Sequence, residues 1–558
     1  MERNLAALTT TEFDLIIIGG GIYGTVAAWD ASLRGLKVAL IEKSDFGGFT
    51  SSNSLKIIHG GLRYIQQGDV KRMRESIRER RILMKIAPHL VHPMPCIMPL
   101  YGHFGKGPEA LRIALLINDI VGFDRNRLDD PQKRLPAGKI LSRAECQRLV
   151  PGAREQNLTG GALWYDCQVY NSERLMISFL HSAAANGAKF ANYVAAKGLV
   201  IRDGRVVGVK AQDTVSGDPL ELWGRMVLNM SGAWANEVMQ WLHPQPKPPR
   251  VKWSRAYNII TRKLVNDYAV GITGKHTVME DGKLVAKGSK VFFIAPWRNY
   301  SLVGTIHDVY NDVPSAFAIR ETEVVNFMQE INDAYPGAQL KRQDIRFFYG
   351  GILPMTRPDA KTGEVVLVKH YHLFDHQKAD GIDGMVSVVG VKYTTARDVS
   401  VKAVDLVVKR LGKSNHGTQT ESVPVFGGAI DRINDFLNQT IIAHKDSLPE
   451  PVIRQLVYNY GSVYPRILNY GEIEPNLLQP LANSAVLPAE IIYAAREEMV
   501  VHLADVVWRR TELGSGGNPG EPVLRAVADL LAKELGWSEQ REREEIEQTQ
   551  RIYQPKKG

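Results

Sequence analysis

The chain has 558 residues, of which 44% are hydrophobic and 23% charged, with a formal net charge of +9. This length exceeds what one hydrophobic core usually organises, so we expect an ordinary soluble globular protein of two or three domains. Its three cysteines, Cys96, Cys146 and Cys167, show neither pairing nor metal-ligand spacing, which indicates a reducing compartment and predicts no metal site.

Residues 1–14 lack the basic start and apolar stretch of a secretion signal. The most apolar later segment, 111–123, is too short to span a bilayer and contains Arg112, Asn118 and Asp119. Lysines and arginines are scattered, so no run predicts a nucleic-acid surface, although the positive charge favours an anionic substrate or lipid surface. We expect a cytoplasmic protein that does not bind nucleic acid, with peripheral contact at the inner face of the membrane as an open alternative.

Residues 13–45 carry the most informative local pattern, FDLIIIGGGIYGTVAAWDASLRGLKVALIEKSD. The β-branched run before the glycines predicts a buried parallel strand and a tight turn into a helix. The spacing Gly19-x-Gly21-x-x-Gly24 lets the backbone approach a pyrophosphate at the start of that helix. Glu42 ends a second predicted strand, where a carboxylate accepts hydrogen bonds from ribose hydroxyls and repels the 2′-phosphate of NADP. The pattern predicts a dinucleotide site, and its position near the N-terminus favours FAD over NAD without deciding between them.

The next stretch, TSSNSLKIIHGGLRY at 50–64, is rich in hydroxyl groups and glycine. Hydroxyls at Thr50, Ser51, Ser52 and Ser54 suit phosphate and flavin polar atoms, and Gly60-Gly61 would let the backbone lie against a flat ring. A capped loop before a helix is the simpler alternative. A long charged helix is then expected at 70–86.

Further along the chain, an αβ unit is expected at 173–209 and another buried strand entering a glycine turn at 227–234. From about residue 421 the chain becomes helical, with helices predicted at 490–511 and 521–535. Three regions are therefore expected.

Several segments together resemble the FAD-dependent glycerol-3-phosphate dehydrogenase family of the aerobic type. They are Thr-Ser-Ser at 50–52, the run 56–64, APHL at 87–90, PW at 296–297, GT at 304–305, KYTTAR at 392–397, YGS at 460–462 and WRRT at 508–511. They span nearly the whole chain. The resemblance implies an α/β fold: an FAD-binding, Rossmann-like domain of the glutathione-reductase type, a mixed-sheet substrate domain and a C-terminal α-helical cap. The implied limits are 1–95, 155–250 and 340–420 for the first domain, 96–154 and 251–339 for the second, and 421–558 for the cap.

The resemblance also implies hydride transfer from an alcohol carbon to flavin N5, with quinone or oxygen as the electron acceptor. The candidate FAD-binding residues are Gly19, Gly21, Gly24, Glu42, Lys43, Thr50, Ser51, Ser52, Ser54, His59, Gly60, Gly61, Val194, Gly232, Lys392, Thr394 and Thr395. The candidate catalytic residues are Arg63, Tyr64, Asn258 and Lys392. The segment 390–395 is expected to open a helix whose amides and Lys392 charge face the flavin N1 and O2 edge.

Two positions depart from the family. Where the family has Gly-Val-Arg-Pro, this chain has Leu353 in the arginine's place, and leucine cannot bind a phosphate. Where the family has Gly-Ser-His-Ile, this chain has Asn258, which cannot act as a base at neutral pH. Compensating groups are expected near the pocket, namely Arg255, Arg262, Arg357, Lys369 and His370.

Three functions remain open on the sequence. The favoured one is oxidation of a polyol, sugar or phosphorylated polyol by an FAD enzyme with an altered pocket. The second is oxidation of glycerol 3-phosphate itself, and the third is a flavin-binding interaction protein without turnover. The histidines of KHYHLFDH at 369–376 could suggest a metal, but alternation along a strand and turn favours solvent-facing residues.

Overall fold

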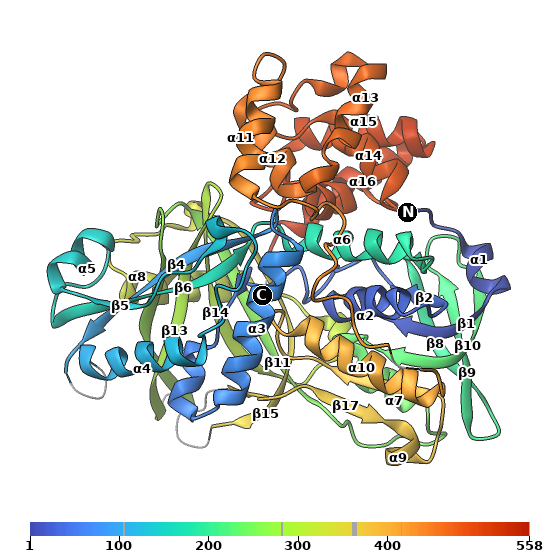
Figure 1. The fold of residues 1–558 in the computed structure, drawn as a ribbon, viewed down its shortest axis with the longest axis horizontal. Helices are drawn as coiled ribbons and strands as arrows, with labels where there is room; N and C mark the ends of the chain where they lie inside the picture. The colour runs from blue at the N-terminus through green and yellow to red at the C-terminus, as the bar shows by residue number, and fades with distance from the viewer. Residues whose placement is uncertain (104–106, 281–282, 360–364, 415, 557–558) are drawn as a thin grey trace.

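The computed structural model describes residues 1–103, 107–280, 283–359, 365–414 and 416–556. Two β-sheets lie side by side in its lower part, and a group of helices formed by the end of the chain sits above one of them (Figure 1). Within the described ranges, none of the helices combines the length and apolar character that crossing a bilayer demands.

The first sheet contains the predicted glycine-rich unit. Its main path runs β17 (His372–Asp375), β18 (Met385–Val389), β10 (Pro219–Asn229), β1 (Glu12–Ile18), β2 (Val38–Ile41) and β7 (Lys189–Ala191). The five strands from β18 to β7 are parallel, while β17 is antiparallel. An antiparallel extension from β10 adds β9 (Arg205–Asp213) and β8 (Val194–Arg202). The strands predicted around residues 15–18, 37–41 and 227–229 are confirmed.

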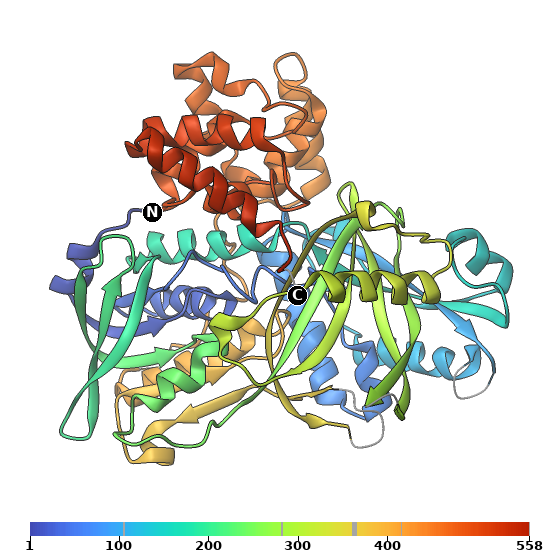
Figure 2. The ribbon, with the colours of Figure 1, turned by 180° about the vertical axis from the view of Figure 1, so that it is seen from behind.

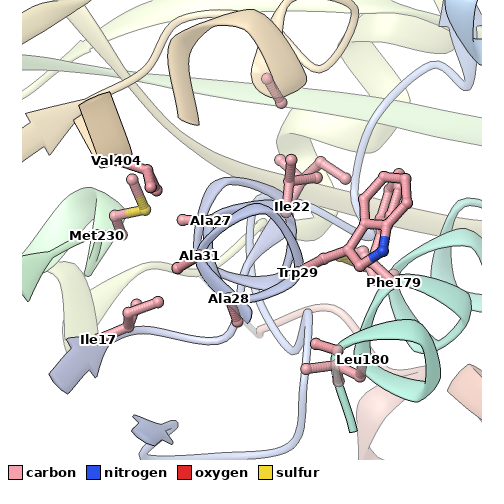
Figure 3. Packing of buried hydrophobic residues seen from close by; sticks show 14 of the residues in the cluster. Ile17, Ile22, Ala27, Ala28, Trp29, Ala31, Phe179, Leu180, Met230 and Val404 are labelled. Carbon is pink, nitrogen blue, oxygen red and sulfur yellow. The ribbon is translucent and has the colours of Figure 1, made fainter. Parts of the chain in front are cut away.

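Helix α2 (Ile22–Leu33) fills the space between this sheet and two neighbouring helices. It lies between α6 (Ser172–Ala185) and α10 (Ala396–Arg410), and its alanines let the helices approach closely (Figure 3). The ring centroids of Trp29 and Phe179 are 5.3 Å apart. This packing fixes the start of α2 at the carboxyl ends of β1 and β2, the edge where ligands bind in open α/β sheets.

The second sheet is mixed and contains ten strands of the described residues. Its path is β16 (Val365–Leu367), β15 (Ile345–Pro358), β11 (Lys252–Arg262), β14 (Tyr300–Tyr310), β13 (Lys283–Trp297), β12 (Ala269–Glu280), β4 (Val91–Tyr101), β6 (Leu158–Val169) and β3 (Ile57–Ile58), with β5 (Lys139–Leu141) beside β6. Helix α8 (Glu321–Ala334) buries Phe327 against this sheet. Residues 155–169 and 345–358, expected in the nucleotide-binding part, thus contribute β6 and β15 here, and the exact domain limits stay a prediction.

Helix α3 (Val70–Ile86) lies where the two sheets meet (Figure 1). Helix α4 (Pro108–Val121) lies along the outer edge of the second sheet (Figure 1). The helix predicted over 70–86 is confirmed with the same bounds. Asp69 caps α3, because its side chain accepts the backbone N–H of Arg72. Shorter helices are α1 (Leu5–Thr10), α5 (Arg143–Leu149), α7 (Ala235–Gln240) and α9 (His376–Asp380).

The C-terminal region is helical, as expected, and it stacks above α6 in both views (Figures 1 and 2). It comprises α11 (Ile433–His444), α12 (Glu450–Tyr460), α13 (Pro465–Ile473), α14 (Pro488–Glu497), α15 (Glu521–Leu535) and α16 (Glu539–Ile552). The single helix predicted over 490–511 is wrong. Met499 has a left-handed φ of 52° after α14 ends, and a π-helical segment starts anew at Asp505, whose side chain accepts two backbone N–H groups.

Candidate functional site

A cavity of about 500 Å³ opens at the carboxyl ends of β1, β2 and β10. This volume lies in the range of small-molecule and cofactor sites. Eight of the predicted cofactor residues line it: Gly19, Gly21, Glu42, Lys43, Thr50, Ser51, Val194 and Gly232.

 Tyr23 also lines the cavity, although the sequence analysis did not assign it to the site. The cavity therefore brings together side chains from both ends of the glycine-rich unit and from β8 and β10.

The glycine motif begins α2 at one wall of the cavity. Gly19 has a left-handed φ of 111°, and Gly21 is the N-cap of α2. A Cβ atom on Gly24 would lie 1.9 Å from the Gly19 carbonyl oxygen, so only glycine permits this close turn. The backbone N–H of Ile22 donates to Ser51 Oγ at 3.0 Å. The start of α2 thus presents N–H groups and a hydroxyl to the cavity, an arrangement that suits a pyrophosphate.

Glu42 is fixed at the end of β2. Its carboxylate accepts the Gly20 N–H at 2.7 Å and both the N–H and the hydroxyl of Ser44 at 3.0 Å. Carboxylate oxygens have further acceptor capacity, so Glu42 can still receive ribose hydroxyls. Beside it, Lys43 Nζ lies 3.2 Å from the ring centroid of Trp234, which also lines the cavity. Trp234 is a cavity residue that the sequence analysis missed.

The hydroxyl-rich loop 50–54 connects the cavity to the second sheet. Thr50 Oγ1 accepts the backbone N–H of Ile352 at 3.1 Å, and Asn53 Nδ2 donates to the Gly350 carbonyl at 2.8 Å. Ser52 Oγ donates to the Gly47 carbonyl at 2.6 Å, and Ser54 Oγ accepts the Lys56 N–H at 3.2 Å. The hydroxyls of Ser52 and Ser54 therefore stabilise the loop itself, and their contact with a cofactor stays a prediction.

The segment with Gly60 and Gly61 is held by a buried carboxylate from β6. Asp166 Oδ1 accepts the Gly60 N–H at 2.5 Å and Arg80 Nη1 at 2.6 Å, while its Oδ2 accepts Trp164 Nε1 at 2.9 Å. A Cβ atom on Gly60 would lie 2.5 Å from Arg80 Nη1. Asp166 is thus a positioning residue for this segment, and nothing in its local sequence marked it.

Three basic side chains surround the ring of Tyr64. Lys392 Nζ and Arg72 Cζ each lie 4.1 Å from its ring centroid, and the His59 ring lies edge-on at 5.8 Å. Burial, with a further contribution from the Arg72 charge, lowers the pKa of Lys392 to about 7. Burial lowers the pKa of His59 to about 4, against the opposing charge of Asp166. His59 is therefore neutral at physiological pH. Arg63, which precedes Tyr64 in the chain, is exposed to solvent.

The start of α10 differs from the sequence prediction. The helix begins at Ala396 with Thr395 as its N-cap, so residues 390–394 form a loop and turn before it and the prediction of a helix opening at Gly390 is wrong. The N–H groups of Val391 and Lys392 both donate to the hydroxyl of Tyr23 at 3.1 Å. This contact arises because the Tyr23 ring packs directly on Gly390, where a Cβ atom would lie 1.9 Å from Tyr23 Cζ. The side chain of Thr394, one of the predicted cofactor residues, is buried.

Asn258 and Leu353 lie on one face of the second sheet. Register partners place Asn258 opposite Tyr349 and Leu353 opposite Ser254, and alternation along β15 puts both on the face that meets loop 50–54. The Asn258 amide is only 2% exposed, donates to the Asn53 carbonyl at 3.3 Å and accepts Thr305 Oγ1 at 2.8 Å. Asn258 therefore positions the loop, and its catalytic role stays a prediction.

Of the groups expected to compensate for Leu353, two arginines are engaged elsewhere. Arg255 donates to Glu323 at 2.9 Å and Arg262 donates to the Ala338 carbonyl at 2.6 Å, both on the side of α8. Arg357, Lys369 and His370 are exposed. His370 Nε2 lies 3.9 Å from Asp69 and thus at the rim of the Tyr64 cluster. Within the described part of the chain, no group of three or more potential ligands could hold a metal ion.

Comparison with known families gives two matches that cover most of the chain. Residues 14–391 match the family described as FAD dependent oxidoreductase, and residues 418–542 match the C-terminal domain of alpha-glycerophosphate oxidase. The chain belongs to the FAD-dependent oxidoreductase family. This enzyme family uses FAD, which identifies the cofactor and confirms the assignment that the family resemblance implied.

Relatives of this oxidoreductase match over nearly its full length. It is 32% identical to a glycerol-3-phosphate dehydrogenase of Synechocystis sp., over 96% of each chain. It is 30% identical to a glycerol-3-phosphate dehydrogenase of Mycobacterium leprae, over 95% of this chain and 86% of that protein. A solved structure of the glycerol-3-phosphate dehydrogenase from Bacillus halodurans, complexed with FAD, is 22% identical with a TM-score of 0.75, covering 98% of this chain and 96% of that one. That likeness confirms the fold class.

The residues at the cavity fit FAD. The start of α2 and Ser51 suit the pyrophosphate, and Glu42 suits the ribose of the adenosine half. The loop at 390–394 lies beside Tyr23, which lines the cavity. When bound, FAD supplies a hydride acceptor. The protein supplies the positions of the charged and polar groups around it.

Proposed function

We propose that this oxidoreductase oxidises the CH–OH group of a phosphorylated polyol to a carbonyl, and that glycerol 3-phosphate is the first substrate to test. One observation carries the proposal: Lys392 and Arg72 both lie 4.1 Å from the Tyr64 ring centroid. Lys392 follows β18, whose carboxyl end is at the same sheet edge as the cavity. Two cations at this edge favour an anionic substrate over a neutral one. The names of the full-length relatives support the same substrate class.

The chain's own groups suit the oxidation of an alcohol. The substrate loses a hydride from the carbon and a proton from the hydroxyl group. A proton acceptor, either a side chain or a water molecule, is therefore needed near that hydroxyl. His59 has a pKa lowered to about 4, so its imidazole is neutral and a weak base, suited to accept a hydrogen bond from the substrate hydroxyl. Tyr64 has a pKa raised to about 12, so its phenol keeps its proton and orients the substrate by hydrogen bonding. When bound, FAD would accept the hydride, and a quinone or oxygen would serve as the final electron acceptor.

The test is anaerobic mixing of the FAD-loaded protein with a panel of phosphorylated and neutral alcohols while the flavin absorbance is recorded. Glycerol 3-phosphate should bleach the flavin faster than glycerol does. Bleaching by a neutral alcohol with no response to any phosphorylated one would contradict the proposal. Reoxidation of the reduced protein by a soluble quinone, compared with oxygen, then identifies the acceptor class.

A second candidate substrate is a neutral polyol or sugar, and Leu353 favours it. An aliphatic side chain on the face that meets loop 50–54 removes one means of holding a phosphate. The variant Leu353→Arg discriminates the two candidates, with Leu353→Met as a control of similar volume. If the natural substrate is phosphorylated and the rest of the pocket suits it, Leu353→Arg should lower the KM for glycerol 3-phosphate by about tenfold. A neutral-substrate enzyme should show no such gain.

We also propose that helix α4 contacts a membrane surface, which would give access to a quinone. Four large apolar side chains are exposed along one side of α4 and its end: Ile113 (62%), Leu116 (61%), Ile120 (64%) and Phe123 (70%). Their spacing of three or four residues places them on one helical face. Arg127 Cζ lies 5.5 Å from the Phe123 ring centroid and adds positive charge beside the apolar stripe, whereas Arg74, at 4.9 Å, is paired with Asp124. This combination suits an anionic lipid surface.

Sedimentation with phosphatidylglycerol vesicles tests this contact. The variant Ile120→Asp should reduce the bound fraction, because a carboxylate is repelled by both the lipid charge and the acyl region. Ile442→Asp is the matched control, since Ile442 is 68% exposed on α11 and is not part of the α4 stripe. Equal loss of binding in both variants, or no binding by the unmodified protein, would contradict the proposal.

A further inference from the structure

Arg72 is a buried guanidinium whose hydrogen-bonding capacity is only partly used by the described residues. It lies in the first turn of α3 and is only 8% exposed. Its nearest recorded carboxylate in the described part of the chain is that of Asp69, with Nη1 3.7 Å from Oδ2. Its Nε is buried and has no hydrogen-bond partner among the described residues. Buried arginines are normally paired and fully hydrogen-bonded, so this one has unused capacity.

A second cation shares the same site. Lys392 Nζ and Arg72 Cζ are equally distant from the Tyr64 ring centroid, at 4.1 Å. The charge of Arg72 is the second cause, after burial, of the lowered pKa of Lys392. The two positive groups therefore repel one another in surroundings that exclude part of the solvent. An anion between or beside them would relieve this repulsion and satisfy Arg72 Nε.

Other groups close to the cluster do not supply that anion. Asp166 is already bound by Arg80, Trp164 and the Gly60 N–H. Glu75 is paired with Lys402 at 3.8 Å, and Asp69 accepts the Arg72 N–H as the cap of α3. The carboxylate of Asp69 is thus paired with Arg72 Nη1 at 3.7 Å, while Arg72 Nε is left for a ligand that the described residues do not provide.

We propose that Arg72 holds the anionic group of the substrate. It would take over the role of the family arginine whose position is occupied by Leu353 in this chain. This inference rests on the proposed function, because it names the residue that recognises the phosphate of the phosphorylated polyol. A planar guanidinium can offer two parallel N–H donors to a phosphate, which a lysine cannot. Arg72 thereby becomes a determinant of specificity for phosphorylated over neutral alcohols.

Calorimetric titration of the FAD-loaded protein with inorganic phosphate, at constant ionic strength, tests the binding step without turnover. Arg72→Met should weaken phosphate binding by about 10- to 100-fold, the loss expected for a charge-assisted hydrogen bond. Arg78→Met is the matched control on the same helix, because Arg78 is 44% exposed and pairs with Glu421. Arg78→Met should bind phosphate as the unmodified protein does. Equal binding by all three proteins, or no binding by the unmodified protein, would overturn the inference.

Steady-state kinetics with glycerol 3-phosphate separate this role from a structural one. Arg72→Met should raise KM by about 10- to 100-fold with a smaller change in kcat, and Arg72→Lys should recover part of the loss because it keeps the charge. FAD content and thermal unfolding establish that each variant folds. A fall in kcat with unchanged KM would overturn the inference. Failure of every phosphorylated alcohol to bleach the unmodified protein would instead reject the proposed function, while the phosphate titration still decides the role of Arg72.

Discussion

Arg510 and Asp45 form a buried, bidentate ion pair that joins the C-terminal helical region to the nucleotide-binding sheet. Arg510 Nη1 donates to Asp45 Oδ2 and Nη2 donates to Oδ1, both at 2.8 Å, and neither side chain is exposed. Arg509 donates to the same carboxylate. Asp45 lies shortly after β2 and Glu42, so the helical region is attached directly behind the cofactor cavity. The two arginines hold the pKa of Asp45 well below its usual range.

Replacing Asp45 by asparagine should strongly destabilise the protein. The substitution removes the carboxylate that two buried guanidinium groups share, leaving Arg509 with Asp505 and Arg510 with the more distant Glu498. Breaking a buried ion pair costs about 3–5 kcal/mol. Urea denaturation measures the free energy of unfolding. Asp129→Asn is the control, because Asp129 is 80% exposed in its pair with Lys85 and should change stability by less than about 1 kcal/mol. Similar effects of the two substitutions would show that the Asp45 cluster contributes little.

Acid should weaken the same attachment through Glu498. Arg174 donates to Glu498 at 2.6 and 2.7 Å, and despite burial the cation lowers the pKa of Glu498 from 4.5 to about 2. A carboxyl group with a lowered folded-state pKa contributes stability that is present above its unfolded pKa and is lost as the pH falls toward the folded value. Stability should therefore decline between about pH 4.5 and pH 2. Glu498→Gln should lower stability at pH 7 and flatten this decline, as followed by thermal unfolding at each pH.

Gly390→Ala should impair FAD binding by displacing Tyr23. A Cβ atom at this position would lie 1.9 Å from Tyr23 Cζ, so the ring and the loop before α10 cannot keep their contact. The flavin-to-protein absorbance ratio of the purified variant should fall. Gly198→Ala is the control, because a Cβ atom there would meet nothing within 4 Å. Adding Tyr23→Ala to Gly390→Ala should restore cofactor content in part, and an unchanged ratio in Gly390→Ala alone would refute the steric argument.

The charge of Lys392 should appear in the pH dependence of activity. Because the pKa of Lys392 is lowered to about 7, its ammonium form is populated below that pH and is lost above it. If the ammonium helps bind an anionic substrate, kcat/KM should fall as the pH rises through about 7, since this ratio reports ionisations of the free enzyme. Lys392→Arg should move this fall to much higher pH, because arginine stays protonated. Profiles that coincide for the two proteins would exclude Lys392 as the titrating group.

Part of the site could be predicted because its signals are local. The glycine spacing at 19–24, the acid Glu42 after β2 and the bounds of α3 follow from periodicity and turn chemistry within a few residues. Two local predictions were wrong. The helix expected at 490–511 is interrupted by the left-handed Met499, and the helix expected at Gly390 starts at Ala396, because Tyr23 holds the preceding backbone amides.

The sequence by itself determined the nucleotide-binding unit, the cofactor and the family. Each of these depends on residues close together in the chain or on short family motifs distributed along it. Only the tertiary structure decided that Arg72 and Lys392 meet at Tyr64, that Asp166 holds Gly60, and that Arg510 pairs with Asp45. These contacts join segments far apart in sequence, so no local pattern encodes them. They form only when burial of apolar side chains brings the two sheets and the helical region together, and burial then fixes which charges remain unpaired and available to a ligand.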